Sequence, residues 1–352
     1  MSEMDGIREH LCAGQVIPAH PLALTEQRTL DEVSQRALTR YYMAAGAGGI
    51  AVGVHTTQFD IRLPRHGLFE PVMELASRTA DESLAAERRP FVKVAGIVGR
   101  TKQALREARL VSELGYHAGL LSLGAWRTDD EAKILAHCRA VGEAIPLFGF
   151  YLQPAVGGRV LSHGFWRQFA EIPSVVAIKI APFNRYQTID VVRAVADVGR
   201  DNVALYTGND DSIVVDLLTR FPCVVDGRLV ERRIVGGLLG HWAMWTRRAV
   251  ELLSTIKRAG SETEMSSDWL RLAAAITDAN GAIFDVRTNF AGCIPGIHEV
   301  LRRQGLMPGT WCLDPSEVLT DEHGKEIDRV MEAYPAMRDD EFVRERLASW
   351  RS

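Results

Sequence analysis

Residues 147–181, LFGFYLQPAVGGRVLSHGFWRQFAEIPSVVAIKIA, decide the fold that the sequence predicts. Their pattern is strand, helix, strand. An apolar run at 147–151 ends on Tyr151 before a proline-bearing turn, and a second apolar run at 175–180 carries Lys179 near its end. A lysine inside a buried strand is uncommon, because its ammonium group is costly to remove from water. Lys179 is therefore the residue that needs an explanation.

Chemistry is one explanation for a lysine in this position. Burial lowers the pKa of a lysine, and the neutral amine is a nucleophile that forms Schiff bases with ketones and aldehydes. Alternation along the strands places Ala177 on the face of Lys179 and Gly149 on the face of Tyr151. If both faces line a barrel interior, Tyr151 and Lys179 meet at the carboxyl-end rim, where (β/α)8 active sites lie. The alternative is a lysine that reaches solvent at the strand end.

Composition bounds the class of protein. The chain has 352 residues, of which 47% are hydrophobic and 24% charged, so it can bury a large core. A formal net charge of −4 argues against a nucleic-acid or anionic-membrane partner. We see no signal peptide and no apolar run long enough to span a bilayer. The cysteines are odd in number and scattered, which favours reduced thiols in a cytoplasmic protein over disulfides or a zinc site. They are Cys12, Cys138, Cys223, Cys293 and Cys312.

Strand-like and helix-like segments alternate along most of the chain. We expect strands at 15–19, 48–54, 91–96, 118–123, 147–151, 175–180 and 203–207. We expect helices between them at 30–45, 70–87, 102–114, 130–144, 165–171 and 187–198. The eighth strand lies within 223–239, where CVVDG and RIVGGLLG both qualify.

This order favours an α/β fold, a (β/α)8 TIM barrel, over an open doubly wound sheet. No GxGxxG follows the first strand, so a Rossmann fold lacks its fingerprint. We predict a barrel domain at 1–248 and a C-terminal helical extension at 249–352, since the latter segment has a helical pattern and no credible strand.

Four features, in order, resemble the dihydrodipicolinate synthase and N-acetylneuraminate lyase family of Schiff-base, class I aldolase-like TIM barrels. The opening GQVIPAHPLALTEQRTLDEVSQRALTRYYMAAGAGGIAVGV is similar to the family's first strand, turn, helix and glycine-rich second strand. HTTQF at 55–59 stands where the family has GTTGE or GSTGE. YLQP at 151–154 resembles Y-N-x-P. AIKIA at 177–181 places Lys179 twenty-eight residues after Tyr151, by subtraction.

The resemblance implies a role for each matching residue. Lys179 would attack the keto carbon of pyruvate or a related 2-oxo acid, and Tyr151 would shuttle protons. Thr56 and Thr57 would hold the substrate carboxylate, with Thr57 hydrogen-bonded to Tyr151. Gly208 would lie near the substrate. The plainer alternatives are a packed rim aromatic for Tyr151, helix capping for the threonines and turn geometry for Gly208.

The resemblance also implies an activity, which is that of a lyase acting on carbon–carbon bonds. It implies no metal and no organic cofactor, a small-molecule 2-oxo acid with an aldehyde or sugar acid as partner, and a homotetramer or homodimer. Three alternatives stay open. They are a sugar-acid dehydratase using the same lysine, a non-catalytic 2-oxo-acid-binding homologue, and a metal-dependent barrel in which Asp210 and Asp211 bind Mg²⁺.

Several departures from the family pattern indicate a divergent member. His55 and Gln58 replace the glycines that flank the hydroxyl pair, and Phe59 replaces an acidic residue. The family's arginine five residues after the tyrosine falls on Val156. Arg159 would substitute for it only if the glycine pair before it allows. SLGAW stands in place of the P-Y-Y run after the fourth strand. We therefore do not expect the lysine-pathway synthase activity itself.

Overall fold

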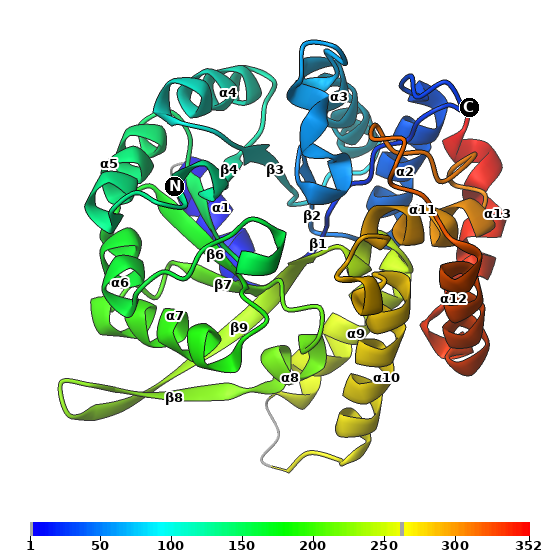
Figure 1. The fold of residues 1–352 in the computed structure, drawn as a ribbon. Coiled ribbons are helices and arrows are strands. Elements are labelled where there is room, and N and C mark those ends of the chain that lie inside the picture. The colour runs from blue at the N-terminus through cyan, green and yellow to red at the C-terminus, as the bar shows by residue number, and fades with distance from the viewer. Residues whose placement is uncertain (1–2, 261–263) are drawn as a thin grey trace. The chain divides into compact units, whose positions relative to one another are not determined.

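The computed structural model describes residues 3–260 and 264–352 (Figure 1). The chain divides into two compact units, each made of two segments. The first unit holds Met1–Gln15 and Val92–Leu238, and the second holds Val16–Phe91 and Leu239–Ser352. Lys179 and Tyr151 belong to the first unit, whereas Thr56 and Thr57 belong to the second.

The first unit is a parallel sheet with a helix after most strands. Its strands follow the order β3, β4, β5, β6, β7, β9, each parallel to the next. They are β3 (Val92–Ile97), β4 (Ala118–Leu121), β5 (Leu147–Leu152), β6 (Val175–Ala181), β7 (Ala204–Thr207) and β9 (Arg228–Leu239). The helices are α1 (Glu3–Cys12), α4 (Thr101–Glu113), α5 (Glu131–Gly142), α6 (His163–Glu171), α7 (Arg185–Val198) and α8 (Ile213–Leu218). Helix α1, which the sequence analysis did not predict, lies against β6 and β7.

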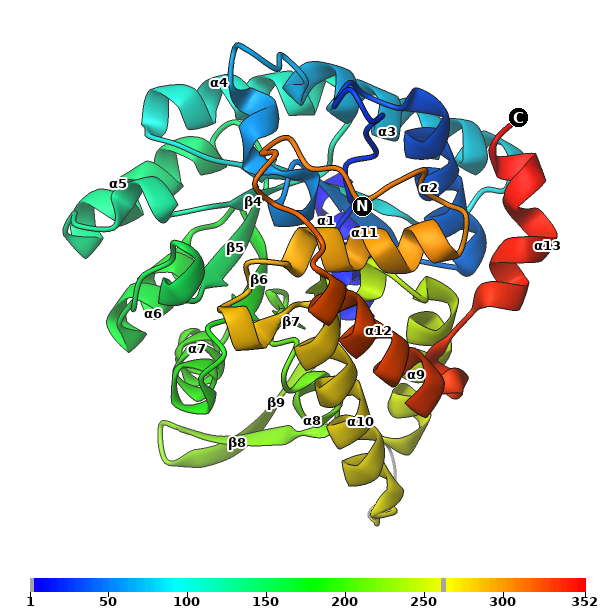
Figure 2. The same cartoon turned by 45° about the vertical axis from the view of Figure 1, so that its right-hand side comes forward.

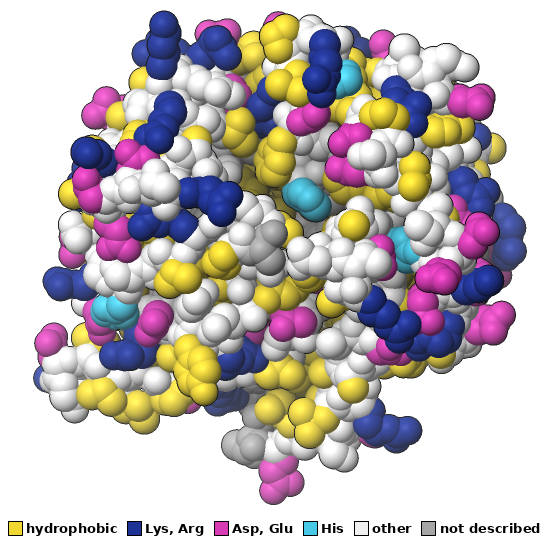
Figure 3. All heavy atoms as spheres, in the orientation of Figure 1, with side chains coloured by type: hydrophobic (Ala, Val, Ile, Leu, Met, Phe, Trp, Pro, Cys, Tyr) yellow, Lys and Arg dark blue, Asp and Glu magenta, His cyan; other side chains and the backbone are white. Residues whose placement is uncertain are grey.

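A long hairpin resolves the question of the eighth barrel strand. β8 (Arg220–Val225) runs antiparallel to the first half of β9 around a turn at Asp226 and Gly227, both with positive φ. The second half of β9 is parallel to β7, with Leu205 opposite Ile234. The RIVGGLLG run is therefore the barrel strand, and CVVDG is the outer arm of the hairpin. Figure 3 shows apolar side chains on this hairpin, where Val224 and Leu229 are each 70% exposed.

The second unit holds the first two βα units and the C-terminal helices. It comprises β1 (Val16–Pro18), α2 (Glu32–Ala45), β2 (Gly49–Val52), α3 (Phe69–Ala86), α9 (Thr246–Ala259), α10 (Asp268–Ile283), α11 (Cys293–Arg303), α12 (Asp321–Ala333) and α13 (Asp340–Trp350). Helices α12 and α13 appear at the red end of the colour scale in Figure 2. Asp339, directly before α13, links this helix to α2, α9 and the end of α11. Its carboxylate accepts hydrogen bonds from the Tyr41 hydroxyl, the Gln304 amide and the Arg247 backbone N–H.

Eight strands, β1 to β7 and β9, alternate with helices in the order predicted for a (β/α)8 TIM barrel with C-terminal helices. Among the described residues beyond Leu239, every regular element is helical. The boundary at residue 248 between a barrel domain and an extension stays a prediction. In the described part of the chain, no helix is both long and apolar enough to cross a membrane.

Candidate active site

The register of β5 against β6 places Phe150, and not Tyr151, beside Lys179. Leu147 pairs with Val175, but Phe148 already pairs with Ala177, so β6 carries one extra residue at this point. Beyond it, Phe150 pairs with Lys179. A one-residue shift moves every following side chain to the opposite face. The prediction that Tyr151 and Lys179 share a face is therefore wrong, because simple alternation does not hold across the irregularity.

Tyr151 faces helix α6. Its ring centre lies 5.0 Å from that of Trp166, and its side chain is fully buried. The hydroxyl group donates to the Leu161 carbonyl at 3.4 Å and accepts from the Leu161 N–H at 3.3 Å. Burial raises the pKa of this tyrosine. The position of Gly149 faces the same helix, since a Cβ added there would lie 2.6 Å from the Phe169 ring. Tyr151 is thus packed against α6 with its hydroxyl bound to Leu161, and its role as a proton shuttle stays a prediction.

Lys179 lies in a mostly apolar setting at the carboxyl end of β6. Its Nζ is 4.7 Å from the centre of the Phe150 ring, and the side chain is only partly exposed. Desolvation lowers the pKa of Lys179 to about 8, against the smaller opposing effect of the Asp210 charge. With a pKa of about 8, roughly a tenth of the lysine is neutral at pH 7, compared with ~0.04% at the ordinary pKa. The arrangement can therefore supply an amine nucleophile.

Gly208 packs directly on the Lys179 side chain. Its N–H donates to the Ile180 carbonyl at 2.7 Å, which fixes the loop after β7 against β6. A Cβ at this position would lie 2.5 Å from Cε of Lys179 and 2.8 Å from Cβ of Ala181. Gly208 does not have a positive φ. Close approach to the lysine, rather than turn geometry, therefore explains the glycine.

Thr56 and Thr57 lie in a short 3-10 helix, η1 (His55–Thr57), after β2. The Thr56 hydroxyl donates to the Ala19 carbonyl at 2.9 Å, and the Thr57 hydroxyl donates to the His20 carbonyl at 2.7 Å. Thr57 Oγ1 also accepts from the N–H groups of Gly53 and Val54. A hydroxyl has one hydrogen and two lone pairs, so that of Thr57 is saturated. Both threonines hold the ends of β1 and β2 together, and carboxylate binding by their hydroxyls stays a prediction.

Gln58, which stands where the family pattern has a glycine, has a backbone conformation that is uncommon for other residues. Its φ is 64°, in the region that glycine favours. Its side-chain Oε1 accepts the Leu313 N–H at 2.6 Å, so the C-terminal segment supports the strained residue. Next to it, the Phe59 ring centre lies 6.2 Å from that of the exposed His55. A change of loop shape relative to the family pattern stays a prediction.

Arg159 binds main-chain oxygens of the loop after β4, and its substitution for the family's arginine stays a prediction. Its guanidinium donates to the carbonyl oxygens of Trp126 at 3.0 Å and Asp129 at 2.6 Å. Arg100 approaches the same loop, with its guanidinium 4.3 Å from the Trp126 ring and 2.8 Å from the Asp129 carboxylate. These contacts join the loops that follow β3, β4 and β5. Sequence reasoning missed this cluster, because no single motif contains its members.

A second strand lysine and the acidic, histidine and cysteine side chains also bear on what the site can do. Lys93, a second lysine in a strand, is 3% exposed within β3 and thus poorly placed to meet a substrate. Within residues 3–260 and 264–352, no group of three or more His, Cys, Asp or Glu side chains is placed to hold a metal ion.

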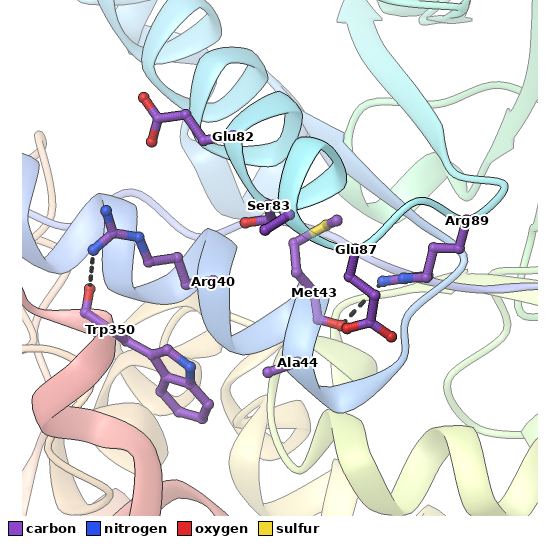
Figure 4. Close-up of a pocket in the computed structure, with 9 residues that line it drawn as sticks. Arg40, Met43, Ala44, Glu82, Ser83, Glu87, Arg89 and Trp350 are labelled. Carbon is purple, nitrogen blue, oxygen red and sulfur yellow. Dashed lines mark hydrogen bonds between the residues drawn. The ribbon is translucent and has the colours of Figure 1, made fainter.

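A pocket of about 400 Å³ lies in the second unit, where helices α2 and α3 end (Figure 4). Arg40 donates to the Trp350 carbonyl and Arg89 donates to the Met43 carbonyl, so both guanidinium groups satisfy main-chain oxygens. Glu82 and Glu87 also line the pocket. None of the predicted catalytic or substrate-binding residues belongs to its lining.

Solved structures with the same fold define the class as (β/α)8 barrels with C-terminal helices. One is CdNal from Clostridium difficile in complex with mannosamine, with a TM-score of 0.71, 16% identity, and coverage of 91% of this chain and 99% of that chain. Another is a prophage protein of the dihydrodipicolinic acid synthase family from E. coli K12, in complex with pyruvate. Its TM-score is 0.72 at 15% identity, covering 92% of this chain and 98% of that chain. A third is N-acetylneuraminate lyase from Fusobacterium nucleatum complexed with pyruvate. Its TM-score is 0.69 at 15% identity, covering 92% of this chain and 97% of that chain.

Sequence similarity is confined to part of the chain. A 4-hydroxy-tetrahydrodipicolinate synthase from Synechococcus elongatus is 29% identical over 120 residues, which are 34% of this chain and 38% of that protein. The corresponding protein of a Cyanothece species is 28% identical over 120 residues, 34% of this chain and 39% of that protein. The chain thus matches under two fifths of the length of these relatives. No family model matches it. The predicted resemblance to the dihydrodipicolinate synthase and N-acetylneuraminate lyase family is confirmed, since its members share this fold and these relatives share part of the sequence.

Proposed function

We propose that this protein is a lyase of the dihydrodipicolinate synthase and N-acetylneuraminate lyase type, in which Lys179 forms a Schiff base with pyruvate or a related 2-oxo acid. The observation that carries the proposal is the setting of Lys179. It is desolvated enough to have a pKa of about 8, yet partly exposed at the carboxyl end of a barrel strand. Two of the solved structures with this fold hold pyruvate, which supports a 2-oxo acid as the ligand.

The chemistry begins with attack of the neutral Lys179 amine on the keto carbon. Loss of water from the resulting carbinolamine gives an iminium ion. In the cleavage direction, the iminium accepts the electron pair of the bond to a hydroxyl-bearing carbon, whose hydroxyl loses its proton as that fragment leaves as an aldehyde. Protonation of the resulting enamine and hydrolysis by water then release the 2-oxo acid and restore the lysine amine. Proton transfer requires a group other than Tyr151 in its present orientation, since Phe150 occupies the place beside the lysine. Bound water and the substrate's own hydroxyl groups are the candidates that need no side chain at that place.

The second substrate and the assembly are also part of the proposal. An aldehyde or a sugar acid would supply or accept the other half of the carbon–carbon bond. A homotetramer or homodimer in the cytoplasm and the absence of a metal or organic cofactor follow from the family resemblance. A sugar-acid dehydratase would use the same lysine.

A non-catalytic 2-oxo-acid-binding protein is a second candidate, and one observation favours it. Phe150, and not a tyrosine, pairs with Lys179 on β5, and the hydroxyl of Tyr206, which pairs with Lys179 on β7, donates to the Leu11 carbonyl. The lysine could therefore form an iminium without an efficient proton relay. Turnover separates the two functions. A binding protein forms the adduct but releases no product from any aldehyde or sugar acid, whereas a lyase releases product.

Borohydride trapping tests the proposal. The protein is reduced in the presence of pyruvate, and the adduct is located by intact mass and peptide mapping, with Lys179→Ala as control. We expect one adduct, on Lys179, which is absent from the variant. Failure to trap an adduct with pyruvate or with a panel of 2-oxo acids would contradict the Schiff-base chemistry.

A further inference from the structure

A buried carboxylate lies under the loop that follows β7. Asp216, on α8, is fully buried. Its Oδ2 accepts hydrogen bonds from the Thr207 hydroxyl at 2.6 Å and the Asn209 amide at 3.0 Å, and its Oδ1 accepts from the Arg185 guanidinium. Burial raises the pKa of this carboxyl group, whereas the three donors oppose the rise. Such a network is costly to disturb, since removal of a donor leaves a buried charge unsatisfied.

Asn209 joins this carboxylate to a second loop. Its Oδ1 accepts the Phe183 N–H at 3.0 Å, and its Nδ2 donates to the Thr188 hydroxyl at 3.1 Å as well as to Asp216. Phe183 has a φ of 52°, a left-handed conformation that is uncommon outside glycine. The side chain of Asn209 therefore holds a strained residue in the loop that follows β6, the strand of Lys179.

Gly208 lies between two residues that are held by Asp216. Thr207 and Asn209 are its chain neighbours, and both bind Asp216. Because an added Cβ on Gly208 would lie within 3.0 Å of both Cε and Cγ of Lys179, the loop backbone determines where the lysine side chain can lie. Displacement of this loop would give the lysine other rotamers and admit water beside its methylene groups.

We infer that Asn209 and Asp216 are positioning residues, which hold Gly208 against Lys179 and so keep its amine desolvated and correctly directed. This inference rests on the proposed function of Lys179. Neither residue touches the reacting atoms in this arrangement. Asp210, in the same loop, is the neighbouring charge that acts on the lysine, and loss of the network would also alter its position.

The experiment measures the reactivity of Lys179 without any 2-oxo acid. The full chain is acylated with acetic anhydride across a pH range, and the modification of Lys179 is followed by peptide mass. In Asp216→Asn and Asn209→Ala, we expect the pKa of Lys179 to rise by at least about one unit, which makes acylation at pH 7 roughly tenfold slower. Thr207→Val should act similarly, and Thr207→Ser should retain the wild-type profile, because serine keeps the donor.

Asp339→Asn is the matched control. Asp339 is a second buried carboxylate with three donors, all of them within the second unit, so its loss tests the general effect of reduced stability. A wild-type acylation profile in folded Asp216→Asn and Thr207→Val would overturn the inference, as would an equal shift in Asp339→Asn. The proposed function fails separately if wild-type protein yields no borohydride adduct while the acylation profile still depends on Asp216.

Discussion

The ends of β5 and β6 carry the two polar residues that the sequence singled out, and the fold treats them in opposite ways. Lys179 on β6 faces Phe150 and Gly208 and is partly exposed. Tyr151 on β5 faces α6, is fully buried and uses its hydroxyl on the backbone of Leu161. For Lys179, the cost of desolvation exceeds the favourable effect of the Asp210 charge, an imbalance that is typical of functional groups. Tyr151 is a packed residue with a satisfied polar atom.

A change in the close packing of Gly208 on Lys179 should have the largest effect on the rate of adduct formation. In Gly208→Ala, the new methyl group must displace the lysine side chain, because its Cβ would lie 2.5 Å from Cε. We expect the rate of adduct formation with pyruvate to fall about a hundredfold, measured by borohydride trapping. Gly164→Ala is the control, since its nearest neighbouring atom lies 3.6 Å away. Equal rates in both variants would show that Gly208 does not determine the position of the lysine.

The pH dependence of adduct formation should follow the neutral fraction of Lys179. With its pKa lowered to about 8, the initial rate should rise about tenfold between pH 6 and pH 7 and level off above pH 8. Trapping at short times across this range measures the profile. A rate that still rises tenfold per unit at pH 9 would mean that the lysine is solvated like an ordinary surface residue.

Replacement of Lys179 should stabilise the fold at neutral pH. The pKa of the lysine is lower in the folded than in the unfolded chain, so the folded state is penalised below pH 8. The penalty fades as the pH rises from about 8 toward the pKa of this lysine in the unfolded chain, which is near 10.4. We expect Lys179→Met to raise the free energy of unfolding by about 1–3 kcal/mol at pH 7. Urea titrations at pH 7 and pH 10 should show a larger gain at pH 7, and a gain that grows with pH would contradict this account.

The smallest effect is expected for Tyr151. Because its hydroxyl makes only two long hydrogen bonds with Leu161, Tyr151→Phe should lower the free energy of unfolding by less than about 1 kcal/mol. Its rate of adduct formation should stay close to that of the wild type, measured by the same trapping. A large loss of rate at unchanged stability would restore Tyr151 as a proton shuttle and would require its ring to leave α6.

Periodicity and turn residues were enough to predict most of the fold. The predicted strand at 175–180 and helix at 187–198 correspond to Val175–Ala181 and Arg185–Val198. These are local properties, since alternation, apolar runs and capping residues such as Asn184 act within a few residues. The N-terminal helix Glu3–Cys12 was missed because its weak apolar pattern depends on packing against β6 and β7 for stability.

The order of strands and helices along the chain was enough to predict the class of barrel. Lys179 also stood out at that level, because a lysine in an apolar strand can be recognised without knowing its neighbours. The residue that lies beside Lys179 could be identified only from the pairing of the strands in three dimensions. The extra residue in β6 changes the pairing to Phe150, and such an irregularity depends on two strands at once. The links among Asn209, Asp216 and Phe183 likewise join separate loops through side-chain hydrogen bonds. Contacts of this kind leave no periodic trace in the sequence, because each one is set by the three-dimensional approach of distant segments.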